Sequence, residues 1–376
     1  MRKETQCIHS GTVRDTIAGG VNSPVFPSSA FGYLDRGEVP YPRYFNTPNQ
    51  KAIVEKVCAL EGAEDGVLFS SGMAAMSTTV LAFAGAGDHV VMMDELYGGT
   101  HAFATDEFRR FGIECTFAAT DADAICGAVK ENTRVVVIES PTNPLLSVVD
   151  IRKVAKFARE RKLVSIIDNT FASPICQNPI ALGMDVVVHS GTKYLGGHSD
   201  LCFGIAVSSR KKAGSIRTVA RSLGGSVNAF TCYMIERSIK TLAIRVGRQC
   251  ENAQRIAGFL EGHSHVKRVN YPGLRTFRHY ELAKAQMDGF GAMLSFELDD
   301  AKIVADRFVK GLRLIAPAVS LGGIETTICS PAVTSHAKMT ASERRRIGVT
   351  DSLLRLSVGI EQADDLVGDI EDALKG

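Results

Sequence analysis

The sequence lacks the features that would direct a chain into a membrane. No apolar run reaches the roughly 18 residues that a membrane-spanning helix needs. The first residues, Met1 to Gln6, also lack the apolar centre of a signal peptide. We therefore expect no membrane partner and a cytoplasmic location.

The sequence also lacks an excess of charge and a pattern of metal ligands. With 43 Lys and Arg against 41 Asp and Glu, the net charge is +2, which gives little attraction to nucleic acid. The nine cysteines are odd in number and scattered, which favours reduced thiols in a cytoplasmic enzyme over a disulfide framework. His189 and His198 have no other ligands at suitable spacing. We expect neither a nucleic-acid partner nor a metal.

The length of 376 residues predicts two domains. Residues 46–244 alternate short Val/Ile runs with helical patterns, which is typical of a mostly parallel sheet covered by helices on both faces. A single long helix over residues 229–260 is predicted to lead into the second region. Residues 245–376 contain an alternating strand and a final helix, and so predict a smaller α+β domain.

Residues 1–45 contain many turn formers and little periodicity. They form either a floppy tail or an arm that packs on a neighbouring subunit. The aromatic side chains of this segment favour the arm, because such side chains are costly to leave in water.

Candidate chemical residues cluster where the predicted strands end, which is where α/β sheets bind ligands. Lys193 follows an apolar strand over residues 186–188 and is flanked by Ser190 and Thr192. A lysine of lowered pKa can form a Schiff base, and the two hydroxyls can hold a phosphate beside it. The alternative is a surface lysine in a glycine-rich loop.

Two further strand ends carry polar residues. Asp168 either pairs with a protonated pyridine nitrogen or is an ordinary turn aspartate before Asn-Thr. Ser71, Gly72 and Met73 lie between a strand and a helix, where backbone N–H groups either bind phosphate or are only part of a helix cap.

Three other residues carry open alternatives. Tyr97 either stacks on a flat cofactor and transfers protons, or is a packing tyrosine. Arg355, in the apolar segment 353–360, binds a substrate carboxylate or forms an internal ion pair. Arg43, in the irregular arm, is either solvated or reaches a neighbouring subunit's phosphate.

Together these stretches resemble the Cys/Met-metabolism family of enzymes that use pyridoxal 5′-phosphate (PLP). The resemblance runs from Thr5 to Glu361 and so covers nearly the whole chain. Spacing also agrees, with 25 residues from Asn143 to Asp168 and 25 from Asp168 to Lys193. The family has fold type I, the aspartate aminotransferase-like α/β fold, which implies a mostly parallel seven-stranded sheet and a smaller α+β C-terminal domain.

The resemblance also implies a role for each site residue. Lys193 would hold PLP covalently and then move protons, with Tyr97 stacking on the ring and assisting. Asp168 would pair with the pyridine nitrogen, and Asn143 would lie near the ring oxygen. Arg355, helped by Ser320 and Asn143, would bind the carboxylate of an amino-acid substrate. The phosphate would contact Ser71, Gly72, Met73, Ser190 and Thr192, together with Tyr41 and Arg43 of a neighbouring subunit. The minimal active unit would then be a homodimer, with a homotetramer expected.

Departures from the family pattern bear on the substrate. Val319 stands where cystathionine γ-synthases and γ-lyases usually carry Glu, and Pro40 where they often carry an acidic residue. Gly99 stands where methionine γ-lyases typically have Cys, and Thr47-Pro48 reverses the usual Pro-Thr order of the arm. We expect a carbon–sulfur lyase acting on methionine, homocysteine or cystathionine. The alternatives are a cystathionine γ-synthase or O-acylhomoserine sulfhydrylase, and a non-catalytic binding protein.

Overall fold

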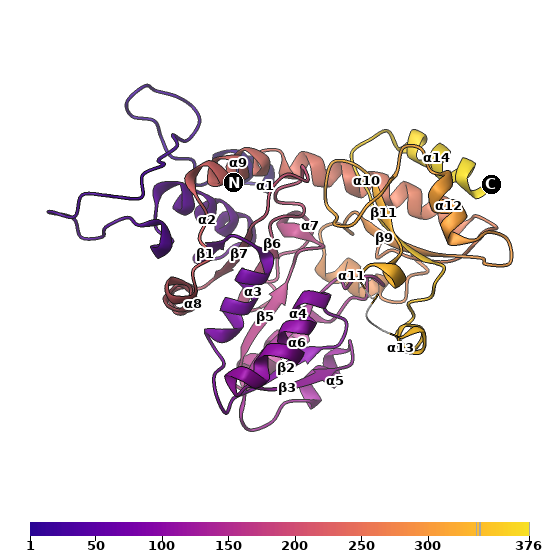
Figure 1. Ribbon diagram of the computed structural model, residues 1–376, viewed down its shortest axis with the longest axis horizontal. Coiled ribbons are helices and arrows are strands. Elements are labelled where there is room, and N and C mark those ends of the chain that lie inside the picture. The colour runs from indigo at the N-terminus through magenta and orange to yellow at the C-terminus, as the bar shows by residue number, and fades with distance from the viewer. Residues whose placement is uncertain (336, 338–339, 376) are drawn as a thin grey trace.

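The computed structural model describes residues 1–335, 337 and 340–375 and contains two sheets (Figure 1). The larger has the order β1-β7-β6-β5-β4-β2-β3. Strand β7 is antiparallel to β1 and β6, and the other neighbours are parallel. This confirms the predicted mostly parallel, seven-stranded sheet. Its strands are β1 (Asp65–Phe69), β2 (His89–Met93), β3 (Glu114–Ala118), β4 (Thr133–Glu139), β5 (Val164–Asp168), β6 (Val186–Ser190) and β7 (Gly204–Ser208).

Helices surround this sheet, and α6 shows how the sequence forms them. Asp150 accepts a hydrogen bond from the backbone N–H of Lys153 and so caps the N-terminus of this helix. The buried residues of α6 recur at helical spacing, so that one face packs on the sheet. The helices of this part are α2 (Pro48–Glu61), α3 (Gly72–Leu81), α4 (Gly98–Ala102), α5 (Ala122–Gly127), α6 (Ile151–Glu160), α7 (Ser173–Cys176), α8 (Arg210–Leu223) and α9 (Ala229–Ile239).

The prediction of one long helix over residues 229–260 is wrong. Helix α9 ends at Ile239 and α10 (Leu242–Glu261) begins after a break. The carbonyl of Ser238 accepts hydrogen bonds from the side chains of Thr241 and Arg245, which stabilise the break. Apolar residues continue at helical spacing on both sides of it, so periodicity alone gives no sign of the interruption.

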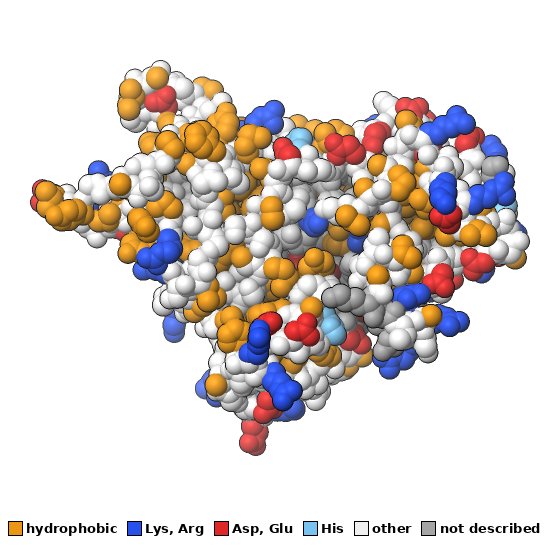
Figure 2. Space-filling model, in the orientation of Figure 1, with side chains coloured by type: hydrophobic (Ala, Val, Ile, Leu, Met, Phe, Trp, Pro, Cys, Tyr) orange, Lys and Arg blue, Asp and Glu red, His pale blue; other side chains and the backbone are white. Residues whose placement is uncertain are grey.

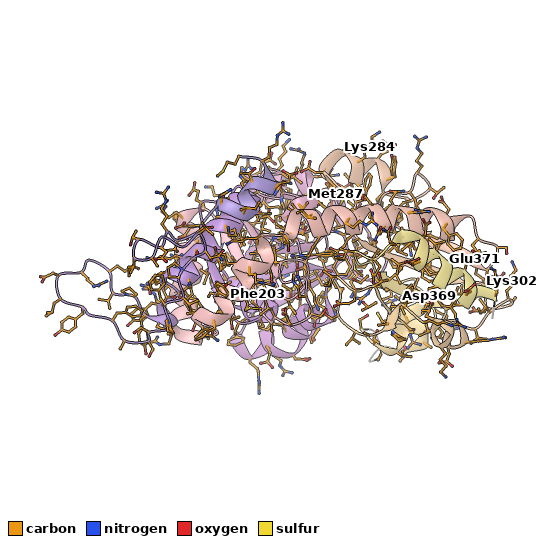
Figure 3. All side chains as sticks on the ribbon, turned by 90° about the horizontal axis from the view of Figure 1, so that it is seen from above. Phe203, Lys284, Met287, Lys302, Asp369 and Glu371 are labelled. Atoms are coloured by element: carbon orange, nitrogen blue, oxygen red, sulfur yellow. The ribbon has the colours of Figure 1, made fainter. Side chains whose placement is uncertain are left out.

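The second sheet is smaller and mostly antiparallel, with the order β10-β11-β12-β9-β8. Helix α14 packs against α10 and α12, and its Asp369 carboxylate, labelled in Figure 3, accepts the backbone N–H groups of residues 313–315. The predicted boundary at residues 244–245 falls inside α10, which thus runs through both parts. The remaining elements are β8 (Val266–Asn270), α11 (Tyr280–Gln286), β9 (Met293–Leu298), α12 (Ala305–Gly311), β10 (Ala316–Pro317), β11 (Thr327–Cys329), α13 (Ala341–Arg346), β12 (Leu353–Ser357) and α14 (Ala363–Lys375).

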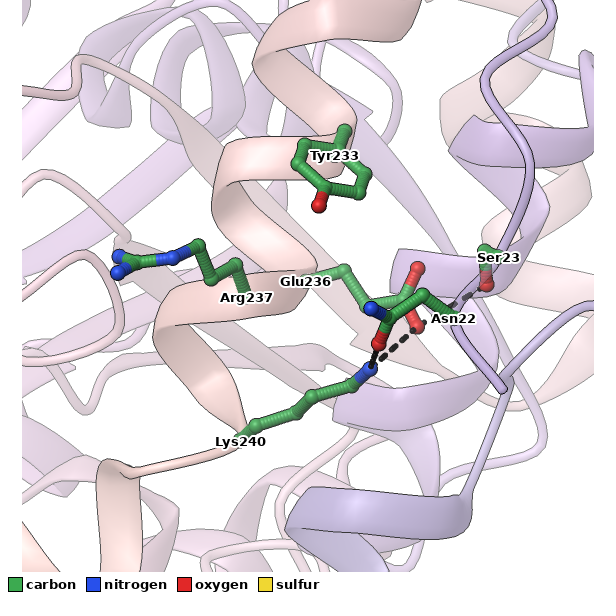
Figure 4. Close-up of a pocket in the computed structure, with 6 residues that line it drawn as sticks. All are labelled: Asn22, Ser23, Tyr233, Glu236, Arg237 and Lys240. Atoms are coloured by element: carbon green, nitrogen blue, oxygen red, sulfur yellow. Dashed lines mark hydrogen bonds and ion pairs between the residues drawn. The ribbon is translucent and has the colours of Figure 1, made fainter. Parts of the chain in front are cut away.

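The N-terminal segment has two differently packed parts. Helix α1 (Lys3–His9) lies against the body of the chain, where the buried Lys56 ammonium donates to the carbonyl of Cys7. Further on, Ser23 donates to the Glu236 carboxylate of α9 (Figure 4). The indigo loops between and after these contacts extend away from the body and carry apolar side chains into solvent, among them Ile17, which is 99% exposed (Figures 1 and 2).

Two further structural findings concern the whole described chain. None of its described helices combines the length and the apolar character that crossing a bilayer requires. All nine cysteines are free thiols, and the Sγ atoms of Cys176 and Cys250 lie 3.6 Å apart.

Candidate active site

A cavity of about 660 Å³ opens at the carboxyl ends of the central strands of the large sheet and is closed by residues of the small domain. This volume suits a small-molecule site. A second hollow, between α9 and the arm, measures only about 110 Å³ and contains a Lys240–Glu236 ion pair (Figure 4). The larger cavity brings together these predicted site residues: Ser71, Gly72, Met73, Tyr97, Asn143, Asp168, Ser190, Thr192, Lys193, Ser320 and Arg355.

One end of the cavity has the hydrogen-bond donors that an anion requires. The first turn of α3 points its free N–H groups there, and the Ser71 hydroxyl caps the helix by accepting from the backbone N–H of Ala74 at 3.1 Å. Gly72 packs on Ser190, and a Cβ atom at position 72 would lie 2.7 Å from the Ser190 Oγ atom. Only glycine allows this approach. The Thr192 hydroxyl bonds to the main chain of Phe203.

Asp168 is a partly buried carboxylate at the end of β5. Its Oδ1 atom accepts hydrogen bonds from the backbone N–H and the hydroxyl of Thr170, at 3.0 and 2.5 Å, so it does make the turn contact. Burial raises the pKa of Asp168 and the Thr170 hydrogen bonds oppose this rise. Within the described part of the chain no ion pair to Asp168 is formed, which leaves room for a cationic ligand group.

Lys193 lies in the turn after β6, and its Nζ atom donates to the Ser320 hydroxyl at 2.7 Å. Burial lowers the pKa of the ammonium group, and the positive charge of Arg355 lowers it further. A lowered pKa increases the share of neutral amine, which is the nucleophilic and basic form.

Arg355, on β12, faces the same cavity. Its guanidinium donates to the side-chain oxygen of Asn143 at 2.9 Å and to the backbone carbonyl of Ser320 at 3.0 Å. The ion pairs of the described residues do not include Arg355, and its buried Nε atom has no hydrogen-bond partner among them. The charge therefore has no internal carboxylate partner in this part of the chain.

Tyr97 lies at the cavity with half of its surface exposed, and its backbone N–H donates to the Glu139 carboxyl group at 2.8 Å. The ring lies over Gly99, because a Cβ atom there would approach the ring Cε1 atom to 2.6 Å. The absence of a side chain at position 99 thus permits this ring position.

Two predicted residues, Tyr41 and Arg43, do not line the cavity of their own chain. Arg43 donates to the backbone carbonyl of Arg221 at 2.7 Å, and its guanidinium lies 5.3 Å from the centre of the Tyr44 ring. Both belong to the arm: Tyr41 precedes the short helix η1 (Pro42–Tyr44), and Arg43 lies within it.

The sequence reasoning missed Glu139, Thr170 and Cys202, which also line the cavity. Glu139 is the clearest omission. It ends β4 as Asp168 ends β5, and an acidic residue closing a Val/Ile run was the available signal. Burial raises the pKa of Glu139 well above its ordinary value, and the neighbouring negative charge of Asp168 raises it further.

These residues fit PLP. Asp168 would hold the pyridine nitrogen, Ser190 and the start of α3 the phosphate, and Lys193 the reactive carbon. Among the described residues, no group of three or more His, Cys, Asp or Glu side chains is arranged to hold a metal ion.

Fold and site together define a PLP-dependent enzyme. Residues 4–375 match the profile of the Cys/Met metabolism PLP-dependent enzyme family, and the chain belongs to that family. The cystathionine beta-lyase MetC of Bacillus subtilis (strain 168) is 41% identical over 377 residues, covering 99% of this chain and 96% of the relative. The L-methionine gamma-lyase of Fusobacterium nucleatum subsp. nucleatum is 41% identical over 386 residues, with coverage of 99% and 97%.

Solved structures agree with these sequence relatives. The crystal structure of cystathionine gamma-lyase from Lactobacillus plantarum, complexed with L-serine, has a TM-score of 0.95 and 37% identity. The match covers 100% of this chain and 99% of that one. The predictions of family, fold and cofactor are thereby confirmed, and the chain is a PLP-dependent carbon–sulfur lyase by class.

Proposed function

We propose that this enzyme releases a thiol, a keto acid and ammonia from a small sulfur amino acid, with methionine and homocysteine preferred over cystathionine. The observation that carries the proposal is the convergence of two cationic groups on one residue. Lys193 donates to the Ser320 hydroxyl, and Arg355 donates to the Ser320 carbonyl. An amino acid whose carboxylate is bound by Arg355 would thus present its Cα to the Lys193 amine.

Each residue then has a role that its surroundings support. Arg355 binds the substrate carboxylate through charge-assisted hydrogen bonds, and Asn143 holds the guanidinium in place. The Lys193 amine, with its lowered pKa, removes the proton from Cα and can return it. Tyr97 covers the cavity and supplies a hydroxyl for proton transfer. When bound, PLP supplies the electron sink that makes the Cα proton acidic enough to remove.

The lining of the cavity supports an uncharged substrate side chain. Val319, Leu321 and Val333 line it beside Ser320. A methyl thioether or a thiol can lie against these apolar groups. The distal ammonium and carboxylate of cystathionine would find no ionic partner at Val319, and leaving charged groups without partners costs affinity.

We further propose that the active unit is a homodimer, assembled into a homotetramer, in the cytoplasm. Tyr41 and Arg43 do not line the cavity of their own chain, and Tyr41 is 41% exposed. Apolar residues of the arm, such as Ile17 and Val21, are exposed at 99% and 90%. Burying them against a second copy, with Tyr41 and Arg43 at its phosphate site, would remove this unfavourable exposure.

The test is a substrate screen on the PLP-loaded enzyme, with Lys193→Ala as the matched control. Release of keto acid and ammonia from L-methionine or L-homocysteine, lost in the control, supports the proposal. Formation of cystathionine or homocysteine from an O-acylhomoserine, with negligible elimination, would contradict it in favour of γ-replacement. A protein that takes up no PLP would contradict the catalytic role altogether.

A further inference from the structure

Glu139 is a buried acid whose position calls for a role. It is the last residue of β4, with 5% of its surface exposed, and it lines the cavity. Its register partner on β5 is Asp168, so two carboxyl groups stand side by side at the strand ends. Within the described chain no ion pair reaches Glu139. Burying a carboxyl group without an ionic partner costs free energy, and the hydrogen bonds that it accepts must offset this cost.

The Glu139 carboxyl group faces the main chain of two other site residues. Its Oε2 atom accepts the backbone N–H of Tyr97 at 2.8 Å. The backbone N–H of Asn143 is also directed at this carboxyl group and lowers its pKa. Tyr97 and Asn143 belong to separate loops, and two acidic side chains connect these loops: Glu139, and Glu95, which accepts from the Thr142 hydroxyl at 2.8 Å.

The residues that follow Tyr97 give its ring little to pack against. Two glycines, Gly98 and Gly99, follow the tyrosine and provide no side chains for packing. The ring lies over Gly99 and is half exposed, so its position depends on the Tyr97 backbone, whose carbonyl accepts from the N–H groups of Thr100 and His101. A backbone N–H held at 2.8 Å from a buried acceptor therefore restricts where the ring can lie.

Through Asn143, Glu139 also influences the position of the arginine on the substrate side. Its side-chain oxygen accepts from the Arg355 guanidinium at 2.9 Å. A shift of the Asn143 backbone would move this oxygen and with it the guanidinium that receives the carboxylate. Contacts from Glu139 thus lead to Tyr97 on the cofactor side and to Arg355 on the substrate side.

We propose that Glu139 is a positioning residue that aligns the tyrosine facing the cofactor and, through Asn143, the arginine that binds the substrate carboxylate. The proposal rests on the PLP site and the function proposed above. It predicts that one substitution at position 139 weakens two separate binding events, although the side chain need not touch either ligand.

The experiment compares Glu139→Met, which removes the acceptor, with Glu139→Gln, which keeps the size of the side chain and one oxygen that can accept the Tyr97 N–H group. Dissociation constants are measured for PLP, by absorbance, and for L-norleucine on the PLP-loaded protein. Norleucine has the shape of methionine and no leaving group, so it reports binding alone. We expect E139M to weaken each by roughly tenfold, and E139Q to stay within about threefold of wild type.

Two double variants test the route of the effect. In a Tyr97→Ala background, E139M should no longer weaken PLP binding, and in an Asn143→Ala background it should no longer weaken norleucine binding. A general loss of stability would instead persist in both backgrounds. If E139M does not fold, Glu139→Asp takes its place, because the shorter side chain withdraws the acceptor from both loops.

Equal losses in E139M and E139Q, wild-type affinities in E139M, or persistence of the effect in the double variants would overturn the proposal. Its failure is separable from that of the proposed function, since neither readout requires turnover. Binding of PLP and norleucine without keto-acid release from any sulfur amino acid would contradict the proposed function alone.

Discussion

The two sides of the cavity are built differently. The cofactor side, formed by Gly72, Asp168 and Ser190, lies at the ends of strands in the large sheet or in the turns that follow them. The substrate side is formed by Arg355 on β12 together with Val319, Ser320 and the segment that follows β11, so it consists mostly of loops of the small domain, where Val319 is 69% exposed. Strand ends are fixed by the sheet, whereas loop positions can change with little cost to the fold. The comparison indicates that the cofactor side determines the type of reaction, and that the substrate side determines which amino acid binds.

The largest effect is expected from Lys193→Ala, which removes the group that joins the two sides. Without the amine as nucleophile and base, keto-acid release should fall by about 10³-fold or more. The rate is measured at saturating substrate, with the PLP content and the far-ultraviolet circular dichroism of the variant as controls for folding. Retention of a tenth of the wild-type rate would contradict the role of Lys193.

The second-largest effect on activity is expected from a change on the substrate side alone. Arg355→Leu removes the charge-assisted hydrogen bonds to the carboxylate, worth about 1.5–3 kcal/mol, so kcat/KM should fall by roughly 10- to 150-fold. Arg355→Lys keeps the charge but not the paired donors and should lie between wild type and Leu. An unchanged KM for the amino acid in R355L would exclude Arg355 as the carboxylate site.

The same difference between strand ends and loops explains which features could be predicted from the sequence. Lys193 and Asp168 follow Val/Ile runs whose ends converge in any parallel sheet, so their meeting followed from the pattern alone. Glu139 obeys the same rule and was missed because an acid at a strand end has many uses. The half-exposed strand β3 was also missed, since its polar residues break the apolar run that marks the buried strands.

Contacts between segments that are distant in the chain could not be predicted from the sequence. The break between α9 and α10 depends on Arg245, whose guanidinium bonds to the carbonyls of Tyr194 and Ser238. The packing of α1 depends likewise on Lys56, a buried lysine at a helical position where charge is unusual. Neither partner can be identified from local periodicity.

A smaller, pH-dependent effect should appear on the cofactor side. Burial raises the pKa values of Asp168 and Glu139 in the folded protein. Such groups stabilise the fold below their unfolded-state pKa, and this stabilisation is lost as the pH rises through the folded-state pKa. The contribution of these two groups to the free energy of unfolding of the PLP-free protein should therefore decrease as the pH rises above about 4. Urea unfolding should show a smaller decrease for Asp168→Asn, and an equal one would contradict this account.

The smallest effect is expected from Val319→Glu, at the rim of the substrate side. A carboxylate there can pair with the distal ammonium of cystathionine, so the ratio of kcat/KM for cystathionine to that for methionine should rise by about tenfold or less. Val319→Gln, without the charge, is the matched control. A ratio that moves equally in both variants would mean that size rather than charge matters at this position.

The most direct test of the division between the two sides is to measure PLP affinity in Asp168→Asn and Arg355→Leu side by side. The account predicts that D168N weakens PLP binding by about tenfold or more, because it removes the carboxylate that would pair with the pyridine nitrogen. Arg355→Leu should stay within about threefold of wild type. If R355L loses as much PLP affinity as D168N, the two sides are not separate and the central claim is wrong.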